Sequence, residues 1–309
     1  MARLIPVVAA LLLLAPGALP AGREGFVNVP GGPVWYRITG DGKGIPILAL
    51  HGGPGGMSCH FEPLAALGST RPVVVYDQLG SGRSGRPTGT DLWTVERFVE
   101  ELDVVRRELG LKQVHLLGHS WGAALAAEYV LSTAGRGVAS LILASPLLSA
   151  KDWLKDAREL RRQLPPAVAE ALDRHEREGT THLPEYREAE REYYRRFVHR
   201  TPPRRIADCA GSEPNWEIYE QMWGPSEFRA TGSLRSFDVT PRLASLRMPV
   251  LLIVGQYDEA RPETAARYRE RIPGARLAVI PDAAHSLFGD APNATLRAIR
   301  SFLEGVPPR

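Results

Sequence analysis

Cysteine is scarce in this sequence, with two among 309 residues, and aromatic side chains make up only 7%. The two thiols, Cys59 and Cys209, are too few for a disulfide framework or a four-ligand zinc site. They could pair in an exported protein, but we expect two separate buried thiols. No structural metal is therefore expected.

No charge of one sign dominates the chain. The 38 Lys plus Arg against 35 Asp plus Glu give a formal net charge of +3. So small an excess of positive charge argues against a nucleic-acid partner, and no cluster of Lys and Arg resembles a surface that binds a polyanion. The 44% hydrophobic and 24% charged residues exclude disorder, collagen and coiled coil, and the length suffices for one large core.

A long hydrophobic run is also missing. The apolar stretch at 4–15 is shorter than the ~20 residues that span a bilayer as a helix. Arg3 precedes it and small residues follow up to Ala21, which is the order of a secretory signal. We predict that residues 1–21 are a cleaved export signal and that the mature chain is secreted or periplasmic without a stable membrane span. An uncleaved amphiphilic anchor and a misassigned start codon are the alternatives.

Further along the chain, short apolar runs alternate with helical patterns. Each run has the length and composition of a strand buried on both faces. Among the helices, 94–109 is the clearest, with Thr94 as its cap and Gly110 where a left-handed residue would end it. This alternation predicts an α/β fold with a mostly parallel central sheet flanked by helices. The expected strands are 45–50, 73–76, 114–117, 141–144, 250–254 and 277–280.

The alternation breaks between residues 150 and 233, where buried runs vanish and charged and aromatic residues are abundant. Segments 157–164 and 185–197 have helical patterns, and most of the charge there is that of a solvated face. We predict a helical cap at 150–233, inserted between the core parts 22–149 and 234–309.

The strongest local signal is Gly118-His119-Ser120-Trp121-Gly122, which follows a predicted strand and precedes an apolar helix. A serine on such a sharp turn projects from the carboxyl edge of the sheet, and the flanking glycines permit the turn. The N-terminal amides of the following helix face the place where negative charge would develop. Ser120 is therefore the candidate nucleophile.

A serine hydroxyl needs a base, and the base needs an acid that holds its tautomer. His285 follows the last predicted strand and is the candidate base, while Asp258 ends the strand before it and is the candidate acid. This chain order is that of an α/β-hydrolase. Asp282 is the alternative acid, although three residues from His285 it fits the local turn better.

Two backbone amides must also face the oxyanion of the tetrahedral intermediate. Trp121, directly after the nucleophile, provides one of them. The other is assigned to Gly53, in the glycine-rich loop 51–56 after the first predicted strand. A tight turn without a ligand role is the alternative for this loop.

A second glycine-rich loop, 77–84, ends another predicted strand. It lacks a following Lys-Ser or Lys-Thr and has no GxGxxG run, so we expect no phosphate or cofactor binding there. We interpret it as scaffolding for the floor of the active site.

Together these segments resemble the proline iminopeptidase family of α/β-hydrolases over nearly all of the mature chain. The motifs are His-Gly-Gly-Pro-Gly-Gly at 51–56, Asp77-Gln78 with Gly80, Gly82 and Ser84, the turn at 118–122, Gly255 to Asp258, and His285. The tricorn-interacting aminopeptidase branch is the most similar, because segments 215–222 and 224–228 are present and Glu259 follows the acid. The resemblance implies an α/β-hydrolase fold with a helical cap after the sixth strand, and a cofactor-free serine aminopeptidase that releases N-terminal proline from short peptides.

In that branch, two glutamates at the positions of Glu227 and Glu259 hold the free α-ammonium of the substrate. Charge-assisted hydrogen bonds from two carboxylates would compensate an ammonium that enters a closed pocket. The pair would then act as a ruler that limits release to one residue. Surface ion pairs with Arg229 or Arg261 are the alternative role for each glutamate.

The preference for proline is implied only by the family. The side chains of Trp121, Trp223, Phe228 and Tyr257 could wall an apolar first-residue pocket, or they could simply pack the cap on the core. Short peptides and amino-acid amides with a free N-terminus are the expected substrates. An amino-acid amidase and a carboxylesterase are the alternative activities, and a hydrolase-fold binding protein is the non-enzymatic alternative.

Overall fold

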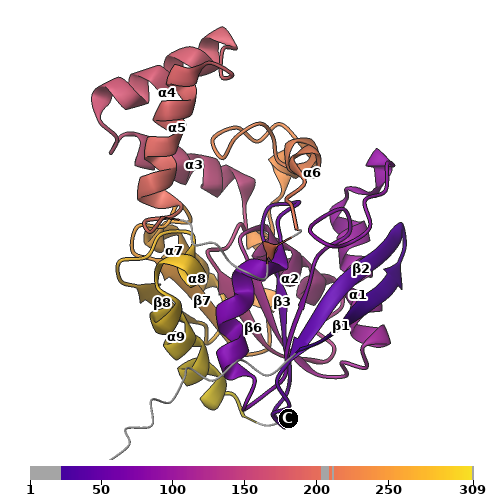
Figure 1. The fold of residues 1–309 in the computed structure, drawn as a ribbon. Coiled ribbons are helices and arrows are strands. Elements are labelled where there is room, and N and C mark those ends of the chain that lie inside the picture. Colours follow the sequence, from indigo (N-terminus) through magenta and orange to yellow (C-terminus); the bar gives the residue numbers. More distant parts are fainter. Residues whose placement is uncertain (1–21, 203–208, 211, 308–309) are drawn as a thin grey trace, which may run out of the picture.

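The computed structural model describes residues 22–202, 209–210 and 212–307 (Figure 1). The predicted export signal, residues 1–21, lies outside the described residues. None of the helices in the described part of the chain is both long and apolar enough to cross a membrane.

A sheet of eight strands runs through the centre in the order β1-β2-β4-β3-β5-β6-β7-β8. Strands β3 to β8 are parallel to their neighbours among themselves, whereas β1 and β2 join the edge antiparallel. The six predicted strands are confirmed as β3 to β8, and the α/β-hydrolase fold is confirmed with them. The strands are β1 (Arg23–Val29), β2 (Gly32–Thr39), β3 (Ile47–Leu50), β4 (Val73–Tyr76), β5 (Val114–His119), β6 (Val138–Ala144), β7 (Val250–Gly255) and β8 (Arg276–Ile280).

The hairpin of β1 and β2 was not among the predicted strands. Few of its residues are buried, namely Val27, Val29, Val34 and Trp35, and the hairpin lacks the long buried apolar run of the parallel strands. The turn depends on Gly31 and Gly32, whose φ values of 103° and 150° favour glycine.

Helices cover both faces of the sheet. The helix predicted at 94–109 is confirmed as α1: the Thr94 side chain accepts a hydrogen bond from the Arg97 N–H, and Gly110 has a φ of 67°. One face packs against α1 (Val95–Glu108), α2 (Trp121–Ser132) and α7 (Pro262–Arg271). The other packs against η1 (Ser58–Leu67), α8 (Leu287–Asp290) and α9 (Pro292–Glu304).

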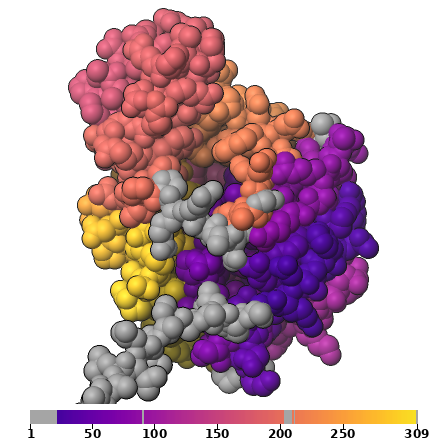
Figure 2. Space-filling view, viewed as in Figure 1, coloured from indigo at the N-terminus to yellow at the C-terminus, as the bar shows by residue number. Residues whose placement is uncertain are grey.

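A helical region is inserted between β6 and β7, above the carboxyl edge of the sheet (Figures 1 and 2). Helix α5 matches the prediction for 185–197, whereas the helix predicted at 157–164 begins earlier, where Ser149 caps it, and ends at Arg161. The helices are α3 (Ala150–Arg161), α4 (Pro166–Glu178), α5 (Pro184–Phe197) and α6 (Trp216–Met222). The short 3-10 helices η2 (Thr90–Leu92), η4 (Ser233–Ser236) and η5 (Thr240–Ser245) complete the connections.

Candidate active site

Ser120 lies on the sharp turn between β5 and α2. Its φ of 57° lies in the left-handed region, which a non-glycine residue adopts only when its surroundings impose it. The backbone is closely packed at this turn. A Cβ on Gly118 would lie 2.1 Å from the Gly122 carbonyl oxygen, and a Cβ on Gly122 would lie 2.0 Å from the Leu50 carbonyl oxygen. The turn thus fixes the Ser120 side chain at the carboxyl edge of the sheet, where it is 9% exposed.

Asp258, after β7, is fully engaged by hydrogen bonds. Its Oδ1 lies 2.9 Å from His285 Nδ1 and accepts the Ala260 N–H, while its Oδ2 accepts the Gly255 N–H and the Ser145 hydroxyl. Four partners leave the carboxylate no freedom to rotate. The alternative acid, Asp282, is exposed in a turn with a φ of 57°, as expected for a turn residue.

His285, after β8, is held from several sides. Its backbone N–H donates to the Phe197 carbonyl at the end of α5, which also accepts the Glu259 N–H, both at 3.2 Å. The His119 Nε2 donates to the His285 carbonyl at 2.9 Å, and the two imidazole centroids are 4.7 Å apart. Burial lowers the pKa of His119 to about 3, so His119 stays neutral. Because His119 adjoins Ser120, these contacts bring the candidate base to the nucleophile turn.

The two predicted oxyanion donors have free amides. Trp121 begins α2, so its N–H has no acceptor within the helix. The Gly53 N–H likewise donates to no group in the described part of the chain. A Cβ on Gly52 would lie 2.9 Å from the Ser120 Cβ, so the loop passes directly beside the candidate nucleophile. The φ of Gly53 is 116°, which requires glycine there.

The two predicted amine-binding glutamates lie on the cap side of His285. Glu259 Oε1 is 3.9 Å from His285 Nε2, and the Glu259 side chain is 2% exposed. Glu227, from the loop after α6, accepts a hydrogen bond from the Tyr219 hydroxyl at 2.6 Å and is partly exposed. Among the described residues neither carboxylate pairs with an arginine; Arg261 faces Asp156 and Glu263 instead.

Some polar atoms around these glutamates are buried without a hydrogen-bond partner among the described residues. Neither Glu259 Oε2 nor the Tyr193 hydroxyl forms a hydrogen bond of normal geometry in this part of the chain, although both lie away from solvent. Burial raises the pKa of Glu259 well above its ordinary value, and the charges of Glu227 and Asp258 raise it further. Burial also raises the pKa of Glu227, against the hydrogen bond from Tyr219. The pocket therefore favours the protonated forms of both carboxyls unless a cation enters it.

The three aromatic residues predicted outside the nucleophile turn differ in their surroundings. Trp223 is 2% exposed within the core, and its indole N–H donates to the Ser226 carbonyl. Phe228 is partly buried with its ring centroid 4.5 Å from that of Tyr193. Tyr257 is 36% exposed, and the Arg200 guanidinium lies over its ring. Phe228 thus has the closest contact with the glutamate pocket.

Sequence reasoning missed several residues of the site. Trp153 of α3 is 6% exposed and its ring centroid is 5.5 Å from that of His285, so it forms part of the pocket beside the candidate base. Ser145, which donates to Asp258, directly follows β6 and has a φ of 46°. The position of Ser145 at a strand end was the only signal that could have marked it. Nothing in the sequence marks Trp153.

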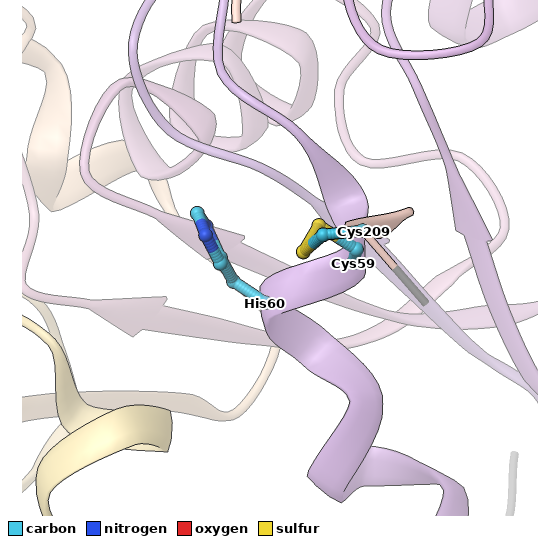
Figure 3. A group of neighbouring side chains, drawn as sticks. All are labelled: Cys59, His60 and Cys209. Atoms are coloured by element: carbon cyan, nitrogen blue, oxygen red, sulfur yellow. A yellow bond between two sulfur atoms is a disulfide. The ribbon is translucent and has the colours of Figure 1, made fainter. Parts of the chain in front are cut away.

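The expectation of two separate thiols is wrong. Cys59 in η1 and Cys209 in the inserted region form a disulfide across a sequence separation of 150, with their Cα atoms 5.3 Å apart (Figure 3). The sequence pattern carried no information on this contact, which the fold alone creates. The His60 ring lies beside the two sulfurs, with the three potential ligand atoms within 4.8 Å of one another. Because metal binding by cysteine needs a thiolate, the bonded sulfurs are not available as ligands.

Several known proteins resemble this chain. The family model of the alpha/beta hydrolase fold matches residues 45–292. The proline iminopeptidase of Heyndrickxia coagulans is 41% identical over 286 residues, which are 92% of this chain and 99% of that relative.

Solved structures agree with these matches. The crystal structure of proline iminopeptidase from Mycobacterium smegmatis has a TM-score of 0.83 at 34% identity, and the match covers 92% of this chain and 98% of that one. The crystal structure of VinJ has a TM-score of 0.85 at 33% identity, covering 94% and 100% of the two chains.

Proposed function

The chain belongs to the proline iminopeptidase family of α/β-hydrolases, and we propose that it is an exported serine aminopeptidase that releases the N-terminal residue, preferably proline, from short peptides. It is a serine hydrolase of the proline iminopeptidase type. One observation carries the substrate assignment: a buried carboxyl group, that of Glu259, lies 3.9 Å from the imidazole of His285, and one of its oxygens has no hydrogen-bond partner in the described part of the chain. A substrate ammonium would supply the missing partner.

In the proposed reaction, the Ser120 hydroxyl attacks the carbonyl of the first peptide bond. His285 Nε2 accepts the hydroxyl proton and returns it to the leaving amine, while Asp258 holds the imidazole through Nδ1. The amides of Trp121 and Gly53 stabilise the oxyanion. Water, activated by the same imidazole, then releases the amino acid from the acyl-enzyme. The acid and base roles thus both fall to one histidine.

The glutamates explain why an aminopeptidase fits this pocket better than an esterase. Two carboxylates, Glu227 and Glu259, form no ion pair with an arginine in the described part of the chain, and the fold buries one of them completely. A neutral acyl group offers these carboxyls no cationic partner, whereas a free α-ammonium offers charge-assisted hydrogen bonds to both. With the ammonium held there, only the first carbonyl of the substrate would face Ser120.

We also propose that the chain belongs to the tricorn-interacting branch of the family. The support is the cap sequence, because segments 215–222 and 224–228 carry Tyr219 and Glu227, which are hydrogen-bonded to each other. Phe228 and Trp153 are the proposed walls for the ring of an N-terminal proline, with Trp223 and Tyr257 at its margins. A wall of aromatic rings suits an apolar side chain rather than a charged one.

Export is proposed from the order of residues 1–21, which is that of a secretory signal. The disulfide of Cys59 and Cys209 supports this proposal, because such bonds persist in oxidising compartments. We therefore expect the mature enzyme in the periplasm or outside the cell. Fusing residues 1–21 to a periplasm-dependent reporter checks this: reporter activity is expected, and an inactive cytoplasmic fusion would contradict export.

The substrate assignment is tested with three compounds whose leaving groups are each followed by absorbance. A proline arylamide should be turned over, its N-acetylated form should not, and an acyl ester without an amine should be a poor substrate. Equal turnover of all three would instead identify an esterase. A proline amide assayed beside a prolyl dipeptide separates an amino-acid amidase from a peptidase.

The nucleophile assignment is tested by Ser120→Ala. We expect activity to fall by about 10⁶-fold, as for a serine that acts as a unit with its base. Circular dichroism and the melting temperature should stay those of the unchanged protein. Retained turnover would mean that another residue is the nucleophile.

A further inference from the structure

The loop after β4 carries a buried side chain that the proposed reaction does not use. Gln78 is 1% exposed, and its side-chain amide lies between the two segments that carry the oxyanion donors. Its Oε1 accepts the indole N–H of Trp121 at 2.9 Å, and its Nε2 donates to the His51 carbonyl at 2.9 Å. An indole N–H can only donate and a carbonyl can only accept, so this orientation of the amide is fixed.

The Gln78 backbone also bonds to His51. Its N–H donates to His51 Nε2 at 2.9 Å, which makes that nitrogen an acceptor. The proton of a neutral His51 must then be on Nδ1, which lies 2.9 Å from the Gly52 carbonyl oxygen. His51 is 2% exposed, so burial favours this neutral form.

The Gly52 carbonyl belongs to the same peptide unit as the Gly53 N–H. Because a trans peptide is planar, an orientation imposed on that carbonyl also sets the direction of the N–H on the opposite side. The Gly56 N–H donates to the same carbonyl at 3.2 Å and supports that orientation. The hydrogen bonds from His51 and Gly56 therefore aim one of the two oxyanion donors.

We propose that Gln78 is a positioning residue that sets the spacing between the two oxyanion donors, the Trp121 and Gly53 amides. One end of its side chain holds the indole of Trp121, and the other end holds the loop that presents Gly53. This inference rests on the proposed function, because it assumes that Ser120 generates an oxyanion. It assigns Gln78 no contact with the substrate.

The proposal predicts a loss confined to the transition state. Gln78→Met keeps the length and burial of the side chain but removes both side-chain hydrogen bonds. We expect kcat on a proline arylamide to fall between about 10-fold and 100-fold, less than the about 10²- to 10³-fold loss from deleting an oxyanion donor. KM should change less than about threefold, because ground-state contacts are kept.

Two probes separate positioning from general damage. Boroproline, which forms a tetrahedral adduct with a nucleophilic serine, should bind Gln78→Met more weakly by the same factor as the loss in kcat. Free proline, a ground-state product, should bind as it does to the unchanged enzyme. Equal weakening of both ligands would overturn the proposal.

Tyr129→Phe is the matched control. The Tyr129 hydroxyl accepts a hydrogen bond from Arg106 and donates one to Asp103, so the variant also loses two hydrogen bonds of a buried side chain, but none that reaches Gln78, His51 or Trp121. Its kcat should stay within about twofold even if its melting temperature falls as far as that of Gln78→Met. A matching loss of kcat in Tyr129→Phe would overturn the positioning role.

Trp121→Phe removes the hydrogen bond between the indole and Gln78 from the side of Trp121. It provides a second test if Gln78→Met does not fold. The loss in the double variant should not exceed that of Gln78→Met alone, since Trp121→Phe removes a hydrogen bond that Gln78→Met also removes. Full kcat in both single variants would overturn the inference while leaving the proposed function intact. Activity in Ser120→Ala would instead overturn the proposed function itself.

Discussion

Two sides of the active site differ in how completely their polar groups form hydrogen bonds: the sheet side, with Ser120, Asp258 and His285, and the cap side, with Glu227, Glu259 and Tyr193. On the sheet side, Asp258 accepts four hydrogen bonds and the donors all come from the chain itself. On the cap side, Glu259 Oε2 and the Tyr193 hydroxyl are buried without a hydrogen-bond partner among the residues that the structure describes. A buried polar atom without a hydrogen bond costs stability, so the fold keeps these two at a cost of about 1–3 kcal/mol each.

The polar groups of the sheet side are thus paired within the chain itself, whereas those of the cap side are left for a ligand to pair. The proposed acid, Asp258, and the proposed base, His285, are oriented without substrate, which favours fast proton transfer. The glutamates are complementary to a cation that the described residues do not supply. The following variants test each half of this contrast, beginning with the largest expected effect.

Asp258→Asn should damage the sheet side most. An amide cannot stabilise the imidazolium of His285, so we expect kcat to fall about 10⁴-fold on a proline arylamide. The Asn amide N–H₂ would also face a backbone N–H, which should lower the melting temperature. Asp282→Asn is the matched control and should keep full activity. If the control lost activity and Asp258→Asn did not, the acid would be Asp282.

Replacing both Cys59 and Cys209 with serine tests the covalent link between the two sides. Because the bond closes a loop across a sequence separation of 150, we expect the unfolding free energy to fall by about 2–4 kcal/mol. Urea unfolding of the unchanged protein in reductant should give the same lowered value. Identical unfolding curves with and without reductant would mean that the bond does not form.

Glu227→Gln should weaken the cap side without touching the sheet side. Losing one charge-assisted hydrogen bond to the ammonium predicts a drop of about 1.5–3 kcal/mol in transition-state binding, roughly 10- to 150-fold in kcat/KM. Glu220→Gln, on the exposed face of α6, is the control and should leave kcat/KM unchanged. An unaltered kcat/KM in Glu227→Gln would remove this residue from the amine site.

Glu259→Gln should reveal the cost of the uncompensated carboxylate as a change in pH dependence. Because the pKa of Glu259 is raised in the folded chain, the folded state binds more protons than the unfolded state above pH ~4.3, and stability falls as pH rises. That fall amounts to at most about 1.4 kcal/mol per pH unit while this proton is lost. The variant should therefore lose less stability than the unchanged protein between pH 5 and pH 8.

Urea unfolding at four pH values in that range measures the effect. Glu270→Gln is the control, because Glu270 is exposed and its replacement should leave the pH profile parallel to that of the unchanged protein. Parallel profiles for Glu259→Gln as well would contradict the assignment of a costly buried carboxylate.

The sheet side could be predicted from sequence because its residues lie at the ends of strands that have a clear sequence pattern. Parallel strands buried on both faces are continuous apolar runs, so β5, β7 and β8 were visible and Ser120, Asp258 and His285 followed from their positions. The β1–β2 hairpin was not predicted because most of its residues are only partly buried or exposed, so it contains no such run.

The cap side could be predicted only by resemblance. Glu227 and Glu259 are two glutamates among many, and their burial depends on how α5, α6 and the loop after β7 come together. The unpartnered Tyr193 hydroxyl and the Trp153 ring have no sequence signal, since an aromatic residue on a charged helix has the same pattern whether it faces solvent or a pocket. The disulfide was missed for the same reason, because its two cysteines meet only in the folded chain.

The Phe197 carbonyl at the end of α5 has a consequence for the evolution of such enzymes. It accepts the backbone N–H groups of both Glu259 and His285, so one inserted helix contacts the proposed amine anchor and the proposed base together. A lineage that exchanged this insertion for another would gain new pocket walls and would also lose one of the contacts that hold the imidazole. We therefore expect changes in the cap to alter selectivity and turnover together.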